Sequence, residues 1–131
     1  MKINIKEATL IVYEGEEILA AFPISSGSKD LPTPKGLWNI QKITYLPEFR
    51  YDKKMLTEGK KGKHYYNLPS GPNSPVGVVW IGLNKSGIGI HGTDTPQTIG
   101  RSTSHGCIRL SNADAMKLST LITLHTPVQI D

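Results

Sequence analysis

One cysteine and two histidines are the side chains in this sequence best suited to covalent catalysis. Cys107 is the only cysteine in 131 residues, in the stretch SHGCIRLSN, with His105 two positions before it and Arg109 two positions after. His91 lies upstream, in the stretch GIHGT. The thiolate is the reactive form of cysteine, and a free thiol with a pKa of about 8.5 needs a base or a positive neighbour to form it. The pattern therefore indicates a cysteine nucleophile with one of the two histidines as its base.

The local sequence around the cysteine suits acyl transfer. In an extended segment, the side chains of residues 105, 107 and 109 point to one side, so an imidazole, a thiol and a guanidinium lie together. Gly106 has no side chain, so the backbone there can pass close to a substrate. Backbone N–H groups at Gly106 and Cys107 can hold the oxyanion of a tetrahedral intermediate.

Two other interpretations of the cysteine stay open at this point. A lone cysteine is most often a small buried hydrophobic residue. His91, His105 and Cys107 are also three possible ligands, and three protein ligands can hold a catalytic zinc. No pair of them has the common spacing of a metal site, whereas SHGC together with an upstream HGT favours the nucleophile.

The elements that position these residues are predicted to be mainly short strands. The chain is 37% hydrophobic and 20% charged, which is typical of one globular domain over residues 1–131. Runs rich in Ile, Val, Tyr and Trp alternate with Gly- and Pro-rich turns. We expect strands at Lys2–Ile5, Thr9–Tyr13, Glu17–Ser25, Leu37–Thr44, Gly77–Leu83, Gly87–Gly92 and Val128–Ile130, with a hairpin at NKS between Leu83 and Gly87.

The strand that ends at His91 carries an informative pattern. Ile88 and Ile90 share one face of this strand, and Gly87, Gly89 and His91 share the other. A face that is bare except for a terminal histidine allows another chain to approach closely.

One helix is predicted near the C-terminus, in SNADAMKLSTLITLH. Ser111 followed three residues later by Asp114 resembles a capping box. Apolar residues then recur at helical spacing, and Pro127 lies just beyond the pattern.

Charge and hydropathy exclude several functional classes. The net charge is +4, and residues 46–66 hold six basic and three acidic residues, which indicates either a solvated loop or a lid that attracts an anionic partner. No pattern of a nucleic-acid-binding fold presents these charges, so no nucleic-acid partner is expected. No apolar run approaches the roughly 18 residues of a membrane helix. The start, MKINIKEATLIVYEGEE, does not read as a signal peptide, so we expect a cytosolic chain or one whose export segment has been removed.

The stretch IHGTDTPQTIGRSTSHGCIRLSNADA, residues 90–115, resembles the signature of the L,D-transpeptidase catalytic domain of the YkuD/ErfK type. That signature is a His-Gly, a spacer, and then Ser-His-Gly-Cys with Arg or Asn two positions later. SSGSKDLPTPKGLWNI, NLPSGPNSPVGVVWIGL and TPVQI are similar to other parts of the family pattern, so the resemblance covers nearly the whole chain. His125 departs from it, because the family often has Gly before TPV.

The resemblance implies a fold and a reaction. The fold is mainly β, a sandwich or barrel-like mixed sheet with one main helix near the C-terminus. The reaction is acyl transfer on peptidoglycan: Cys107 attacks the diamino-acid carbonyl of a donor tetrapeptide stem, D-alanine leaves, and an acceptor amine resolves the thioester. Water as acceptor would make an L,D-carboxypeptidase, and a non-catalytic peptidoglycan-binding domain is the alternative from another class.

The resemblance also assigns roles to individual residues. His91 is the base and the Gly92 carbonyl orients it, while His105 positions and hydrogen-bonds. From the residues themselves, we expect Ser104 to brace the loop or a histidine, Gly106 to lie at the oxyanion region, and Thr93 to supply a loop hydroxyl.

Arg109 is expected to anchor a substrate carboxylate or support the oxyanion region, with a structural salt bridge to Asp94 or Asp114 as the alternative. No cofactor or metal is expected. The expected partners are peptidoglycan stem peptides, the expected state is a monomer, and the expected location is the cell envelope.

Overall fold

The computed structural model describes residues 1–51, 62–104 and 106–131. Most of the elements are short strands. In chain order the elements are β1 (Lys2–Asn4), β2 (Thr9–Glu14), β3 (Glu17–Pro23), β4 (Ser26–Gly27), β5 (Gly36–Tyr45), β6 (Phe49–Tyr51), β7 (Tyr66–Leu68), β8 (Val79–Leu83), β9 (Gly89–His91), the 3-10 helix η1 (Pro96–Thr98), β10 (Ser102–Ser104), β11 (Ile108–Arg109), the α-helix α2 (Asn112–Leu121) and β12 (Pro127–Ile130).

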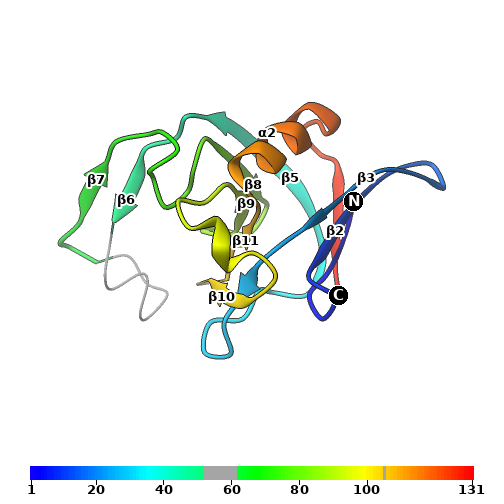
Figure 1. Ribbon diagram of the computed structural model, residues 1–131, viewed down its shortest axis with the longest axis horizontal. Coiled ribbons are helices and arrows are strands. Elements are labelled where there is room, and N and C mark those ends of the chain that lie inside the picture. The colour runs from blue at the N-terminus through cyan, green and yellow to red at the C-terminus, as the bar shows by residue number, and fades with distance from the viewer. Residues whose placement is uncertain (52–61, 105) are drawn as a thin grey trace.

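Eight of these strands form one curled mixed sheet, in the order β11-β9-β8-β5-β12-β1-β2-β3. The β1–β12 and β11–β9 pairs are parallel, and the other neighbours in the sheet are antiparallel. The sheet curls into a half-barrel, and α2 packs across β8 and β9 (Figure 1). This arrangement confirms the predicted mainly β fold with a helix near the C-terminus.

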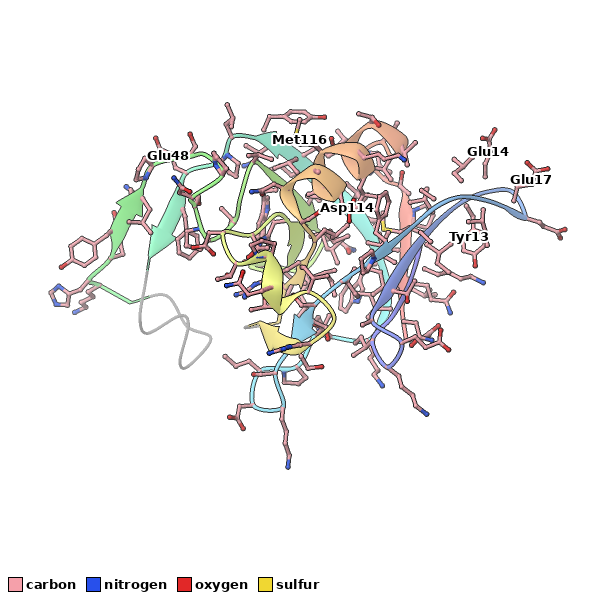
Figure 2. The ribbon with its side chains drawn as sticks, viewed as in Figure 1. Tyr13, Glu14, Glu17, Glu48, Asp114 and Met116 are labelled. Carbon is pink, nitrogen blue, oxygen red and sulfur yellow. The ribbon has the colours of Figure 1, made fainter. Side chains whose placement is uncertain are left out.

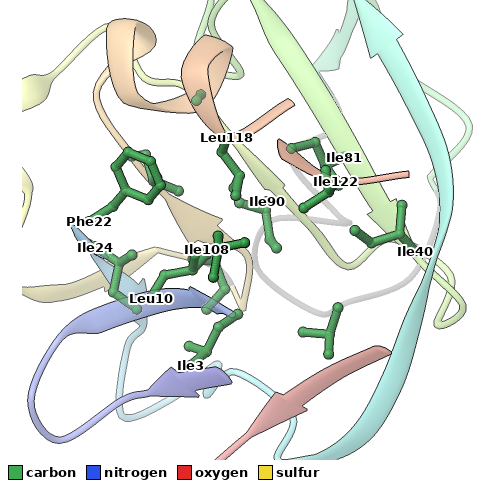
Figure 3. Close-up of a cluster of buried hydrophobic side chains, with 14 of the residues drawn as sticks. Ile3, Leu10, Phe22, Ile24, Ile40, Ile81, Ile90, Ile108, Leu118 and Ile122 are labelled. Atoms are coloured by element: carbon green, nitrogen blue, oxygen red, sulfur yellow. The ribbon is translucent and has the colours of Figure 1, made fainter. Parts of the chain in front are cut away.

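Apolar side chains from the sheet and from α2 form the core (Figure 3). Ile90 of β9 and Ile108 of β11 are fully buried, as is Leu118 of α2. Burial of one such side chain stabilises the fold by roughly 1.5–3 kcal/mol. The two isoleucines are next to His91 and Cys107 in sequence, so the core fixes the two backbone segments that carry the predicted reactive groups.

The predicted strands and helix correspond to observed elements. All seven predicted strands are present, with ends within two residues of the prediction. The predicted hairpin joins β8 to β9, where the Leu83 N–H donates to the Ile88 carbonyl at 3.0 Å. Ser111 caps α2, since its Oγ accepts a hydrogen bond from the Asp114 N–H at 3.1 Å. The strands that were not predicted are β4, β6, β7, β10 and β11, of two or three residues each.

The turn between α2 and β12 explains the departure at His125. This residue has φ of +71°, in the left-handed region that glycine adopts without strain. Its N–H donates to the Ile40 carbonyl at 2.7 Å, which fixes the turn against β5.

The predicted lysine-rich lid lies partly outside the described residues, which do not include 52–61. On either side of that gap, β6 and β7 pair as a separate antiparallel ribbon in which Phe49 lies opposite Leu68.

Candidate active site

His91 occupies the end of β9 and is only 3% exposed. Its Nδ1 is hydrogen-bonded to the backbone carbonyl of Gly92. Because a carbonyl oxygen can only accept, Nδ1 carries the proton, and the neutral ring keeps Nε2 as its basic nitrogen. The side chain is thus held in one tautomer by its own backbone.

Trp80 fixes the other side of the imidazole. It lies opposite His91 in the β8–β9 ladder, and the two rings stack with centroids 5.4 Å apart and planes 18° from parallel. The indole also covers Gly89, where a Cβ atom would lie 2.6 Å from Trp80 Cζ2. The glycine face of β9 is thus covered by an aromatic ring of the same chain.

Burial keeps the imidazole neutral. Desolvation, assisted by the positive charge of Arg109, lowers the pKa of His91 from 6.5 to about 4. The hydrogen bond to Gly92 acts in the opposite direction but is the weaker influence. A neutral imidazole at neutral pH can accept a proton, as a general base must.

Cys107 lies directly before β11, on the strand next to His91. The two strands are parallel, with Ile108 opposite Ile90 and Arg109 opposite His91. The same register brings Cys107 level with Gly89, two residues before His91. Alternate residues of a strand share a face, and two residues span about 6.6 Å. The backbone of Cys107 therefore lies at the edge of the sheet, about two residues along the ladder from His91.

The thiol is protonated in this state. Burial raises the pKa of the Cys107 thiol, although a backbone hydrogen bond with Gly89 and the charge of Arg109 both act to lower it. Its Sγ donates to the Gly87 carbonyl at 3.3 Å. The resting pair is thus a neutral thiol beside a neutral imidazole, rather than a preformed ion pair.

Arg109 supplies positive charge to both groups. Its backbone pairs with Ser25 through two hydrogen bonds of 2.9 Å, which ties β11 to the segment after β3. Among the described residues, its buried Nε has no hydrogen-bond partner, and neither has the buried Oγ of Ser25. Burial lowers the pKa of Arg109, and the charges of Cys107 and Asp94 oppose that shift. Asp94, one of the two predicted salt-bridge partners, therefore interacts with it electrostatically.

The remaining predicted site residues are placed as follows. Gly106 has φ of +110°, and a Cβ there would lie 3.3 Å from Ile88 Cδ1, so this position suits glycine. Thr93 is buried, and its Oγ1 accepts from the Thr95 N–H at 3.0 Å, within the loop that follows β9. Only the backbone of Ser104 is described, at the end of β10, and His105 lies outside the described residues.

Comparison with known proteins now decides the family. The family model of the L,D-transpeptidase catalytic domain, YkuD, matches residues 1–130. The chain belongs to the YkuD family. A Bacillus licheniformis protein that carries the family name YkuD is 29% identical over 128 residues, which cover 98% of this chain and 62% of that protein. The chain thus spans less than two thirds of the length of this relative.

Solved structures show that the YkuD fold is preserved. The catalytic domain of the Enterococcus faecium L,D-transpeptidase has a TM-score of 0.76 and 21% identity, over 99% of this chain and 94% of that one. L,D-transpeptidase 3 from Mycobacterium tuberculosis, solved with a faropenem-derived adduct, has a TM-score of 0.74 and 19% identity, over 99% and 58%.

Two residues of the YkuD site were not predicted to be part of it. Trp80 was not among the predicted site residues: the predicted hairpin, with Leu83 opposite Gly87, would place Trp80 opposite Ile90, whereas the observed register places it opposite His91. Asn112 was noted only as part of the helix start. Its side chain instead reaches Gly92 and the loop before β8, a contact between distant segments that leaves no local signal.

The described part of the chain offers no metal centre. Within residues 1–51, 62–104 and 106–131, no group of three or more His, Cys, Asp or Glu residues is placed to hold a metal ion. The zinc interpretation needed His105 as a third ligand, and this residue lies outside those ranges. In the same ranges, no helix is both long enough and apolar enough to cross a membrane.

Proposed function

We propose that this YkuD domain is a cysteine-dependent L,D-transpeptidase of peptidoglycan, with Cys107 as nucleophile and His91 as base. The observation that carries the proposal is the hydrogen bond from His91 Nδ1 to the Gly92 carbonyl. It leaves Nε2 as the basic nitrogen of a histidine whose strand, β9, pairs with β11 directly after Cys107. A base oriented by a third group beside a thiol is the arrangement of cysteine acyltransferases.

In the first half-reaction, the Cys107 thiol turns from the Gly87 carbonyl toward His91. Nε2 takes the thiol proton as Sγ bonds to the diamino-acid carbonyl carbon of the donor stem. Backbone N–H groups at Gly106 and Cys107 stabilise the oxyanion. When the tetrahedral intermediate collapses, the bond to D-alanine breaks, and the leaving amine takes the proton from His91, which leaves a thioester on Cys107.

In the second half-reaction, an acceptor amine attacks the thioester. Nε2 of His91 removes a proton from that amine, the carbon–sulfur bond breaks, and the proton returns to Cys107. The product is an amide between two diamino-acid residues. Water in place of the amine gives a carboxylic acid, the L,D-carboxypeptidase outcome.

We assign supporting roles to the other predicted residues. Arg109 anchors a substrate carboxylate or supports the oxyanion region, and its charge favours the thiolate as it forms. Thr93 holds the loop after Gly92, Ser104 braces the cysteine loop, and His105 positions the substrate. We further propose that residues 1–131 act as one monomeric catalytic domain in the cell envelope, where peptidoglycan stem peptides lie.

The test is the fate of a defined donor. Tetrapeptide stems are incubated with the protein, with and without an acceptor stem, and the products are separated by chromatography and identified by mass spectrometry. We expect a crosslinked dimer and free D-alanine from the wild type and neither from Cys107→Ala. Tripeptide alone would support the carboxypeptidase, and stems bound but unchanged would support the non-catalytic binding domain and overturn the proposal.

A further inference from the structure

The side chain of Asn112 fills the space between two glycines at the edge of the active site. Asn112 is the first residue of α2. A Cβ atom added to Gly92 or to Gly77 would collide with its Oδ1. The same Cβ on Gly77 would also lie 2.7 Å from Cα of Gly92, so the three residues pack without room for another side chain.

Hydrogen bonds fix this amide in place. Its Oδ1 accepts from the Val78 N–H at 3.2 Å, and its Nδ2 donates to the Pro72 carbonyl at 3.4 Å. Asn112 therefore joins three segments that are distant in sequence: the start of α2, the loop that leads into β8, and the end of β9. The Gly92 N–H completes the junction, since it donates to the Val79 carbonyl at 3.4 Å.

Gly92 is the residue whose carbonyl holds the proton of His91 on Nδ1. A carbonyl can serve as this acceptor only while its peptide group keeps one orientation, and glycine is the residue with the widest conformational freedom. The Asn112 side chain leaves no open space beside the Gly92 Cα. We propose that Asn112 is a positioning residue that holds the Gly92 peptide so that its carbonyl selects the Nδ1-protonated tautomer of His91.

The expected effect of Asn112 on the rate of Cys107 acylation rests on the proposed function. The expected effect on the tautomer of His91 does not. Outer partners that orient a histidine through its second nitrogen commonly change the affinity or activity of metal sites by roughly ten- to hundred-fold when mutated. We expect an effect of that size on the rate at which Cys107 is acylated, and little effect on initial binding.

Three variants separate the contributions of the amide. Asn112→Leu keeps the approximate volume and removes both hydrogen bonds. Asn112→Asp keeps the Oδ1 acceptor for Val78. Asn112→Ser removes the contact without added bulk and serves if the leucine variant does not fold. Ser111→Ala is the matched control, because it removes the cap of the same helix and leaves the Asn112 contacts in place.

Two readouts are measured on each variant: the tautomer of His91, by nitrogen-15 NMR with the signal assigned through His91→Gln, and the rate of Cys107 acylation by imipenem across pH. We expect Nδ1-protonated imidazole in the wild type, in Asn112→Asp and in Ser111→Ala. Asn112→Leu and Asn112→Ser should show a mixture of tautomers and acylation slowed roughly ten- to hundred-fold.

An unchanged tautomer and rate in the leucine and serine variants would overturn the inference, as would the same changes in Ser111→Ala. Failure of the proposed function looks different. In that case the wild type itself is not acylated, while the NMR comparison still tests the role of Asn112.

Discussion

The two ends of the eight-stranded sheet are built differently. At one end, β2 and β3 form a hairpin of six and seven residues whose tip, with Tyr13, Glu14 and Glu17, reaches beyond the body of the molecule (Figure 2). At the other end, β9 and β11 are three and two residues long and pair in parallel. The hairpin end is a long antiparallel ladder, whereas the end that carries Cys107 and His91 has almost no ladder.

Different interactions hold the two ends. The hairpin end is stabilised by buried side chains, Leu10, Val12 and Phe22, and by the backbone pairing of β2 with β3. At the site end, a buried histidine stacks on Trp80, and glycines pack directly against side chains. Stability in the hairpin is therefore spread over many equivalent contacts, while the geometry of the site depends on a few close approaches that tolerate no added atom.

Adding one methyl group at each end should change the free energy of unfolding by very different amounts. The loss at the site end is the largest effect we expect. In Gly89→Ala, the new Cβ meets the Trp80 ring at 2.6 Å and the Ile81 carbonyl at 2.8 Å. We expect a loss of about 3 kcal/mol in the free energy of unfolding, since overpacking of this kind costs 1–3 kcal/mol or more, and loss of acylation. Gly15→Ala at the hairpin turn meets nothing within 4 Å and has φ of +60°, so it should cost only about 1 kcal/mol. Urea unfolding of both variants measures the difference, and equal losses would contradict it.

Acid should weaken the site end through His91. Burial lowers the pKa of His91 to about 4, so between pH 6.5 and pH 4 the unfolded chain binds a proton that the folded protein does not. Stability contributed by the neutral imidazole is therefore complete above pH 6.5 and is lost as the pH falls through this window. At about 1.36 kcal/mol per pKa unit, the loss is about 3 kcal/mol.

The measurement for this prediction is urea unfolding at pH values from 7 to 4, in the wild type and in His91→Gln. The wild type should lose more stability than the variant over this range. Parallel curves for the two proteins would show that His91 is not buried in its neutral form.

Removing the charge of Arg109 should have a smaller effect than the two changes above. It should alter the pKa of Cys107 and the rate of acylation. Its positive charge lowers the pKa of Cys107, so Arg109→Met should raise the pKa of the thiol. We expect acylation to slow by roughly ten-fold, the lower end of what a hydrogen bond to a charged group contributes. Arg101→Met is the matched control, because Arg101 is exposed. The thiolate absorbance is titrated in all three proteins, and a thiol pKa that is equal in them would argue against the electrostatic role.

The smallest effect is expected at a turn that belongs to neither end. His125 is exposed and holds φ of +71°, so His125→Gly should relieve strain and stabilise the fold by up to about 1 kcal/mol, partly offset by the greater freedom of glycine when unfolded. Thermal unfolding measures the gain. The rate of acylation should be unchanged. A lower melting temperature would show that the histidine side chain stabilises the fold by more than the strain in its backbone costs.

The same contrast explains what the sequence could predict. The alternating apolar residues of β2 and β3 and the capped pattern of α2 are local signals, so these elements were predicted with nearly correct ends. The short strands β4, β10 and β11 form only because distant segments pair, as Arg109 does with Ser25. No periodicity can reveal a strand of two residues.

The candidate site also combines residues with local sequence signals and residues that depend on contacts between distant segments. Cys107, His91 and Gly92 were predicted from their motifs, and the structure places His91 at the end of β9 and Cys107 directly before β11, the strand that pairs with β9. The stacking of Trp80 on His91 was not predicted, because the observed hairpin register differs by one residue from the predicted one. The packing of the Asn112 side chain between Gly77 and Gly92 requires three distant segments to meet in space. The order of residues along the chain does not reveal that they meet.

The most direct test of the account is covalent trapping of Cys107 and its dependence on His91. Wild type, Cys107→Ala and His91→Gln are incubated with imipenem at neutral pH, and intact mass and peptide mapping follow the adduct over time. We predict one adduct per chain, on Cys107, in the wild type, none in Cys107→Ala, and strongly slowed formation in His91→Gln. An adduct that forms at the wild-type rate without His91, or no adduct in the wild type, would contradict the account.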